Sequence, residues 1–269
     1  MLKKRVATAV LLLPLVVVVV WFNEPVPLLA VFAAIWGVLA AWEFYRAVTN
    51  SGQKVPPLTA FGLLLTLLFI ISPLFDYHYL NLILLTSAVV LPAILFLVRC
   101  YTEGTFAGWA WTVAGILCIG WLLSHFVALR ELDSGRDWVL FALFVTFASD
   151  SAAYFVGSAI GKHRLAPGIS PKKTWEGAAG GVAGAIGVGL LLIMLLNLPV
   201  SYIQAVPLAI AVSIFGQFGD LLESLFKRRV GIKDSGKAMP GHGGFLDRMD
   251  SVAFAGAFVY YNALLLYNG

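Results

Sequence analysis

The chain has 269 residues, of which 60% are hydrophobic and 12% are charged. Soluble domains are about half apolar and about one quarter charged, so this composition excludes an ordinary soluble domain. The formal net charge is +4, from 18 Lys and Arg against 14 Asp and Glu. The chain is therefore expected to be built into a membrane.

Apolar stretches close to the length of a bilayer-crossing helix recur along the whole chain. A helix needs roughly 20 residues to cross about 30 Å of hydrocarbon. Such stretches predict an all-α, polytopic integral membrane protein with about nine transmembrane helices. The predicted helices are Val6–Trp21, Val26–Trp42, Leu58–Ser72, Leu80–Val98, Trp109–Leu129, Trp138–Ile160, Ala178–Leu196, Tyr202–Phe226 and Ser251–Tyr267. The third is short, and a re-entrant hairpin there would change the number of crossings.

The N-terminal stretch has two interpretations. Lys3, Lys4 and Arg5 precede an apolar run, as in a signal peptide, but the apolar stretches that follow favour an uncleaved first helix. Cys100 and Cys118 give no disulfide pattern. Because no internal repeat or low-complexity linker occurs, a single integral membrane domain over residues 1–269 is expected.

The distribution of basic residues predicts the orientation. With nine helices and a cytoplasmic N-terminus, every Lys and Arg except Arg130 and Arg136 falls on the cytoplasmic side. Two cytoplasmic loops, residues 161–177 and 227–250, combine these cations with Gly, Ser and Thr. Glycines let backbone N–H groups approach a phosphate closely, so both loops predict phosphate binding. Neither contains a P-loop or a G-x-G-x-x-G motif.

Carboxylates interrupt two of the predicted helices. Asp150 lies in one, and Asp220 and Glu223 lie in another. Ionisable residues inside membrane helices are unfavourable and usually functional. With Ser224 and Lys227, Asp220 and Glu223 follow i, i+3, i+4, i+7 spacing, which predicts one polar helical stripe.

Asp247 and Asp250 repeat the i, i+3 spacing where the last predicted helix begins. Helix capping and the helix dipole also explain acidic residues at such a position. For Asp220, a structural ion pair with Lys227 or Arg248 is a second explanation, and Asp150 could likewise pair with a lysine. A divalent cation together with a phosphate substrate would account for the acids and the bases at once, because Mg²⁺ binds a few carboxylates plus phosphate oxygens.

The residues from Ser224 to Asp250 carry a family resemblance. The stretch contains S-L-F-K-R, then K-D at 233–234, P-G-H-G-G at 240–244 and D-R-M-D at 247–250. This pattern resembles the signature of phosphatidate cytidylyltransferases, also called CDP-diacylglycerol synthases. The blocks ASDSAAYFVG, GKH and SPKKTWEG upstream are similar to further blocks of that family. Met239 and Ser158 depart from the family pattern, and Ser158 would change one phosphate contact.

The resemblance implies a reaction in which CTP and phosphatidic acid give CDP-diacylglycerol and pyrophosphate with Mg²⁺. It implies generic membrane helices over residues 1–104 and catalytic helices over 105–269, which carry the two cytoplasmic loops. A homodimer is compatible with it, whereas no nucleic acid is expected as a partner. Separately, the compact chain and its basic N-terminus favour a bacterial cytoplasmic (inner) membrane, with the site facing the cytoplasm and an organellar membrane as the alternative.

Roles for individual residues follow from the same resemblance. The implied metal ligands are Asp220 and Asp247, with Glu223 and Asp250 as further ligands. His242 would donate a hydrogen bond or a proton to the leaving pyrophosphate. Residues expected to bind phosphates or line the substrate cavity are Asp150, Lys172, Lys173, Ser224, Lys227, Arg228, Lys233 and Arg248. For Lys172 and Lys173, attraction to anionic lipid is an equally good explanation.

Three other functions are alternatives to cytidylyl transfer. An ion- or proton-coupled transporter would also carry intramembrane carboxylates, but it needs polar groups toward both membrane faces. A CDP-alcohol phosphotransferase would carry a D-G-x-x-A-R array, which the sequence lacks. A purely structural protein would leave the polar residues of 224–250 without a purpose.

Overall fold

The computed structural model describes residues 14–22, 24–75, 77, 79–99, 103–236, 238 and 243–268. Its helices confirm the predicted α-helical membrane class. Six described helices are long and apolar enough to cross a membrane, and Thr59–Leu74 is a shorter apolar helix. The predicted number of about nine is not confirmed, because Val6–Trp21 lies partly outside the described residues and the last helix is not among the six.

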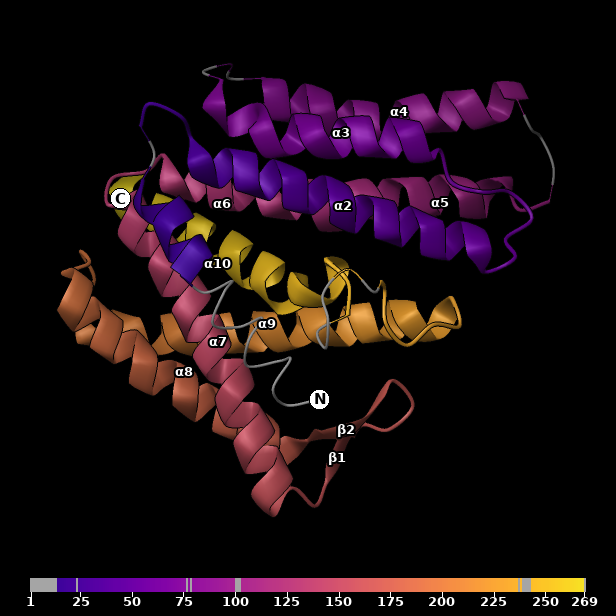
Figure 1. The fold of residues 1–269 in the computed structure, drawn as a ribbon. Coiled ribbons are helices and arrows are strands. Elements are labelled where there is room, and N and C mark those ends of the chain that lie inside the picture. Colours follow the sequence, from indigo (N-terminus) through magenta and orange to yellow (C-terminus); the bar gives the residue numbers. More distant parts are fainter. Residues whose placement is uncertain are drawn as a thin grey trace. The chain divides into compact units, whose positions relative to one another are not determined.

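Helices make up most of the described chain (Figure 1). Their bounds are α2 Leu28–Asn50, α3 Thr59–Ile71, η1 Ser72–Leu74, α4 Leu80–Arg99, α5 Thr105–Gly115, η2 Ile116–Trp121, α6 Leu122–Arg130, α7 Gly135–Ile160, α8 Trp175–Leu196, α9 Tyr202–Arg229, η3 Leu246–Arg248 and α10 Asp250–Asn268. Two strands, β1 Arg164–Ala166 and β2 Ser170–Thr174, form an antiparallel hairpin. The π-helical turn η2 joins α5 and α6 into one apolar helix, Thr105–Arg130.

Two elements differ from the sequence prediction in ways that affect the site. The apolar run ends at Trp42, but α2 continues to Asn50 and therefore contains Glu43. Hydropathy marks where apolar residues stop, whereas a helix continues as long as its backbone hydrogen bonds are favourable. The sequence predicts a cytoplasmic loop over residues 161–177, and in the structure these residues contain the β1–β2 hairpin and the first turn of α8.

The chain divides into two compact units. Unit 1 comprises Met1–Glu131 and Arg229–Arg248, and unit 2 comprises Leu132–Arg228 and Met249–Gly269. In unit 1, helices α2 to α6 lie alongside one another (Figure 1). The buried Tyr45 of α2 donates a hydrogen bond to the carbonyl of Thr112 in α5 at 2.8 Å. The short η3 packs against α2.

In unit 2, α7 and α8 pack closely along much of their length. The face of α8 toward α7 is built from small residues, among them Gly177, Gly181 and Ala185. A Cβ at Gly181 would lie only 3.1 Å from the carbonyl oxygen of Ser149. Small residues at four-residue intervals let membrane helices approach closely, which explains why this glycine-rich sequence forms a packed helix.

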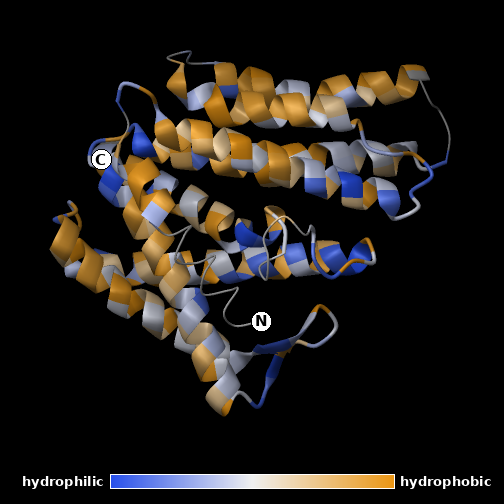
Figure 2. Cartoon of the chain, viewed as in Figure 1, coloured by the Kyte–Doolittle hydropathy of each residue, from blue (hydrophilic) through white to orange (hydrophobic). Residues whose placement is uncertain are grey.

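Polar residues of unit 2 gather at the hairpin and at the C-terminal part of α9, while the helices are otherwise largely apolar (Figure 2). Thr174 caps α8, because its hydroxyl accepts a hydrogen bond from the N–H of Gly177 at 3.1 Å. His163, before β1, contacts Glu176 of α8 at 2.6 Å. These contacts fix the hairpin at the start of α8.

Candidate functional site

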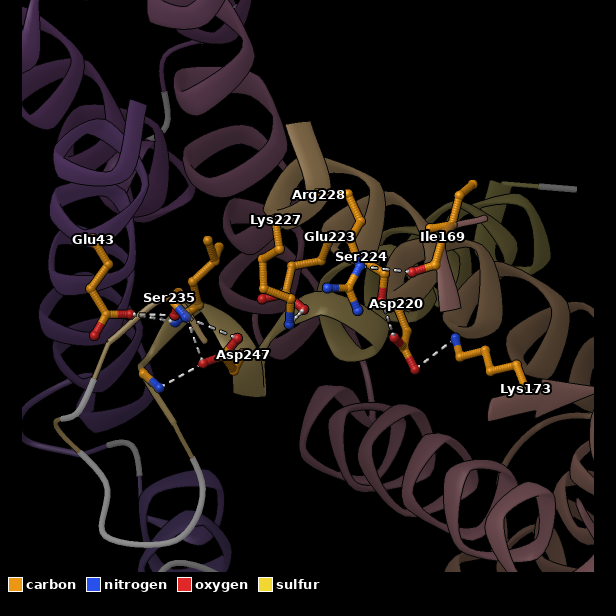
Figure 3. Close-up of polar contacts among 12 residues, drawn as sticks. Glu43, Ile169, Lys173, Asp220, Glu223, Ser224, Lys227, Arg228, Ser235 and Asp247 are labelled. Atoms are coloured by element: carbon orange, nitrogen blue, oxygen red, sulfur yellow. Dashed lines mark hydrogen bonds and ion pairs between the residues drawn. The ribbon is translucent and has the colours of Figure 1, made fainter. Parts of the chain in front are cut away.

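An ion pair in unit 2 joins the hairpin to α9. The ammonium of Lys173 on β2 lies 2.7 Å from Oδ2 of Asp220 on α9 (Figure 3). The side chains of Lys173 and Asp220 are 24% and 34% exposed. The predicted structural partners of Asp220 were Lys227 and Arg248, and the structure instead pairs it with Lys173.

The predicted polar stripe of α9 is confirmed. The hydroxyl of Ser224 donates to Oδ1 of Asp220 over a long 3.4 Å, one helical turn away. Lys227 donates to the buried Glu223 at 2.8 Å, again one turn away. Both predicted carboxylates of this helix therefore have a local hydrogen-bonding partner on the same stripe.

Arg228, next along α9, donates from Nε to the carbonyl of Ile169 at the tip of the hairpin at 3.2 Å. The C-terminal turns of α9 are thus held to the hairpin at two points, the Lys173–Asp220 pair and this bond (Figure 3). Helix α9 ends in Lys227, Arg228 and Arg229, and the hairpin carries Arg164, Lys172 and Lys173, so both of the joined elements carry basic residues.

Asp150 of α7 also belongs to this group. It lies within hydrogen-bonding reach of Ser251 in α10, and the charges of Asp220, Asp250 and Lys173 act on it. Asp150, Asp220 and Asp250 come from α7, α9 and α10, and they are 30 to 100 positions apart in the sequence. Unit 2 therefore brings together three of the predicted acidic residues and one predicted lysine.

Asp247 lies in unit 1, in η3, and is buried. Its carboxylate oxygen Oδ2 accepts hydrogen bonds from the backbone N–H of Gly244 at 2.7 Å and of Ser235 at 3.0 Å. The hydroxyl of Ser235 donates in turn to Oε2 of Glu43 at 2.9 Å (Figure 3). Glu43 was not predicted as a site residue, because nothing near it in the sequence resembles a motif.

Other predicted site residues lie at exposed positions or outside the described part of the chain. The side chains of Lys172, Lys233 and Arg248 are exposed. His242 lies outside the described residues. Asp220 belongs to unit 2, whereas Asp247 belongs to unit 1.

The acidic side chains of unit 2 suit a metal ion that takes its remaining ligands from a substrate. In the described part of the chain, no group of three or more His, Cys, Asp or Glu residues is arranged to hold a metal ion by itself. Mg²⁺ is usually bound by one or two carboxylates together with substrate phosphates rather than by an all-protein cage. The hard carboxylate oxygens of Asp220, Asp150 and Asp250 match that preference chemically.

The sequence is similar to a known protein family. A family model described as the cytidylyltransferase family matches residues 3–266. A phosphatidate cytidylyltransferase from Bacillus subtilis is 44% identical over 151 residues, which is 56% of each chain. A relative of the same name from Brucella suis is 44% identical over 57% of each chain. A third, from Staphylococcus epidermidis, is 34% identical over 84% of this chain and 86% of its own length. The chain thus spans a little over half the length of the first two relatives.

Proposed function

The chain belongs to the cytidylyltransferase family, and we propose that it transfers the CMP group of CTP to phosphatidic acid, giving CDP-diacylglycerol and pyrophosphate. The names of the relatives and the signature between Ser224 and Asp250 carry this proposal. The cluster of Asp220, Lys173 and Arg228 beside the hairpin supports it, because two polyanionic reactants need cations close to the reacting phosphorus.

The reaction is an in-line displacement. A phosphate oxygen of phosphatidic acid attacks the α-phosphorus of CTP, a new P–O bond forms, and the bond to the β-phosphate breaks so that pyrophosphate leaves. The second pKa of a phosphate monoester lies near 6, so the lipid phosphate is mostly dianionic at neutral pH. No strong general base is required, and catalysis rests on positioning and charge neutralisation.

The roles of the side chains follow from charge. Lys173, Arg228 and the other basic residues of the two loops would bind phosphate groups and offset their mutual repulsion. The family resemblance, rather than the geometry, implies Asp220 and Asp247 as residues that would hold Mg²⁺, with Glu223 and Asp250 as further ligands. The metal, when bound, would supply Lewis-acid neutralisation of phosphate charge. His242 keeps its proposed role as a hydrogen-bond or proton donor to the leaving pyrophosphate.

The setting proposed for this chemistry is a bacterial cytoplasmic membrane, with the basic loops on the cytoplasmic side where nucleotides are found. The lipid substrate would reach the site from the bilayer, and CTP would reach it from the aqueous phase. A homodimer is compatible with this arrangement, and no nucleic acid takes part.

Pyrophosphate release tests the proposal. Purified protein in mixed micelles is supplied with CTP and Mg²⁺, with and without phosphatidic acid, and the other nucleoside triphosphates serve as controls. Release that requires both CTP and phosphatidic acid is expected. Folded protein that releases none with any nucleotide would contradict the proposal and favour the transporter, which would then be tested by ion uptake into proteoliposomes.

A further inference from the structure

Glu43 is a buried carboxylate in a helix that the sequence indicated to be generic. Its side chain belongs to α2, and the residue is only 5% exposed. Burying a charged group is unfavourable unless hydrogen bonds compensate for the lost water. Oε2 of Glu43 accepts two such bonds, from the backbone N–H of Leu246 at 3.0 Å and from the hydroxyl of Ser235 at 2.9 Å.

These two donors come from different described stretches of the signature region. Ser235 lies in residues 229–236, and Leu246 lies in residues 243–248. Glu43 therefore joins both stretches to α2. Leu246 is adjacent to Asp247, and Ser235 donates its backbone N–H to Asp247 at 3.0 Å. Two routes thus link Glu43 to Asp247: a hydrogen bond to Leu246, which precedes Asp247 in the chain, and two successive hydrogen bonds through Ser235.

The glycines of this region make room for Glu43. A Cβ at Gly236 would collide with Oε1 of Glu43, and a Cβ at Gly244 would collide with Oε2 and with the Ser235 hydroxyl. Glycine is the only residue without a Cβ, so it permits this close approach. The sequence suggested that such glycines serve phosphate binding, and in the structure these two face a carboxylate of the protein itself.

A second contact from the same face of α2 reinforces the attachment. Trp36 lies seven residues before Glu43, which places both side chains on one face of a helix. The indole N–H of Trp36 donates to the carbonyl of Phe245 at 3.1 Å, and the two rings meet edge to face with centroids 5.0 Å apart. Helix α2 therefore contacts Phe245 and Leu246, the two residues that precede Asp247.

We propose that Glu43 is a positioning residue, which ties the two stretches to α2 and thereby holds the Asp247 carboxylate in place. The functional part of this inference rests on the proposed cytidylyl transfer. The attachment itself does not, because it can be measured without substrate or metal.

The first experiment measures backbone order. Amide hydrogen exchange is followed by mass spectrometry on protein in micelles, without CTP or Mg²⁺, in peptides covering residues 243–248. In Glu43→Ala, loss of the acceptor should let these amides exchange at least about tenfold faster than in the wild type, as expected when a segment opens locally. Glu43→Gln keeps one side-chain oxygen as an acceptor and should lie between the two. Ser235→Ala removes one of the two donors and should also raise the exchange rate.

The control is the same Glu→Gln substitution at a different position of unit 1. Glu103 is a glutamate of unit 1 whose side chain is 85% exposed and pairs with Lys54. Glu103→Gln should leave exchange in 243–248 and turnover as in the wild type. Peptides from α4 report whether any variant has lost its fold, and a variant that has is replaced in the comparison by Ser235→Ala or Glu43→Gln.

The second experiment measures transfer. Misplacement of a catalytic group by about 1 Å can lower turnover about 10²-fold, so kcat of Glu43→Ala should fall by that order, with partial recovery in Glu43→Gln. The Mg²⁺ concentration that gives half-maximal rate should rise in parallel. Unchanged exchange in Glu43→Ala, or faster exchange with full turnover, would overturn the proposal. A wild-type protein without any transfer activity would instead contradict the proposed function and leave the exchange result to decide the attachment.

Discussion

Adjacent lysines on β2 have different surroundings. Lys173 contacts Asp220 at 2.7 Å and is partly buried, whereas Lys172 is exposed. Successive side chains of a strand point to opposite faces, so one lysine faces α9 and its neighbour does not. An exposed charge acts mainly through long-range attraction, which salt screens over about 10 Å at 0.1 M.

Substitution of the two lysines should therefore change different kinetic constants. Lys173→Gln should lower kcat at least about tenfold, because Asp220 loses its counter-charge beside the reacting phosphates. Lys172→Gln should raise KM for CTP a few-fold with little change in kcat, and the change should fade in about 0.5 M salt. Steady-state kinetics at two salt concentrations measure both. Equal effects of the two substitutions would contradict the distinction.

Asp247 offers the most direct test of the proposed metal ligands. Asp247→Asn removes the charge but keeps a side-chain oxygen that can accept from the N–H groups of Ser235 and Gly244. The fold should persist, while Mg²⁺-dependent turnover should fall at least about 10²-fold. Asp133→Asn, at an exposed loop position, is the matched control. Full turnover in a folded Asp247→Asn protein would rule out its role as a metal ligand.

Residue spacing predicted part of this site and missed another part. The i, i+3, i+4 stripe of α9 was readable because neighbours one turn apart on a helix touch. Glu43 was not, since its partner Leu246 is 203 residues away and no local pattern encodes such a contact. The one available signal was a glutamate directly after an apolar run, which is also typical of a helix end near a membrane surface.

Among the elements, α2 and the hairpin show where hydropathy is insufficient. The run of apolar residues predicted an end at Trp42, eight residues before α2 ends at Asn50. The polar residues 161–177 predicted a loop, but β1 pairs with β2, His163 contacts Glu176 of α8, and Lys173 contacts Asp220 of α9. In both places, packing against another element decides the structure, and composition does not report packing.

The small-residue face of α8 gives a prediction at this scale. Gly181→Leu would force a branched side chain into the contact with Ser149 and Ala153, where even a Cβ is tightly placed. Overpacking of this kind costs about 1–3 kcal/mol, so the α7–α8 pair and the hairpin that follows α7 should be destabilised. Thermal unfolding in micelles should show a lower midpoint than the wild type.

Gly187 provides a control on the same helix, because a Cβ there meets nothing within 4 Å. Gly187→Leu should unfold at nearly the wild-type midpoint. If both leucine variants unfolded alike, helix propensity rather than close packing would explain the glycines of α8.

For the whole molecule, the number of membrane crossings and the orientation in the membrane depend on different features of the chain. Six described helices satisfy the length and hydropathy expected of a membrane span, and the predicted number of about nine depends on the remaining apolar segments. The orientation depends instead on the side that holds the basic loops. Both loops flank long helices, so the side on which each lies can be measured directly.

Helix α8 separates two sites suited to labelling. Gly168, between β1 and β2, is exposed and has nothing within 4 Å of a Cβ, and Ser201, beyond the C-terminal end of α8, is also exposed. In 22 residues α8 extends about 33 Å at 1.5 Å per residue, enough to cross the hydrocarbon. With Cys100 and Cys118 replaced, an impermeant maleimide applied to intact cells should label Ser201→Cys, and should label Gly168→Cys only after permeabilisation. The reverse pattern would invert the orientation and move the basic loops away from cytoplasmic CTP, whereas labelling of both sites from one side would show that α8 does not cross.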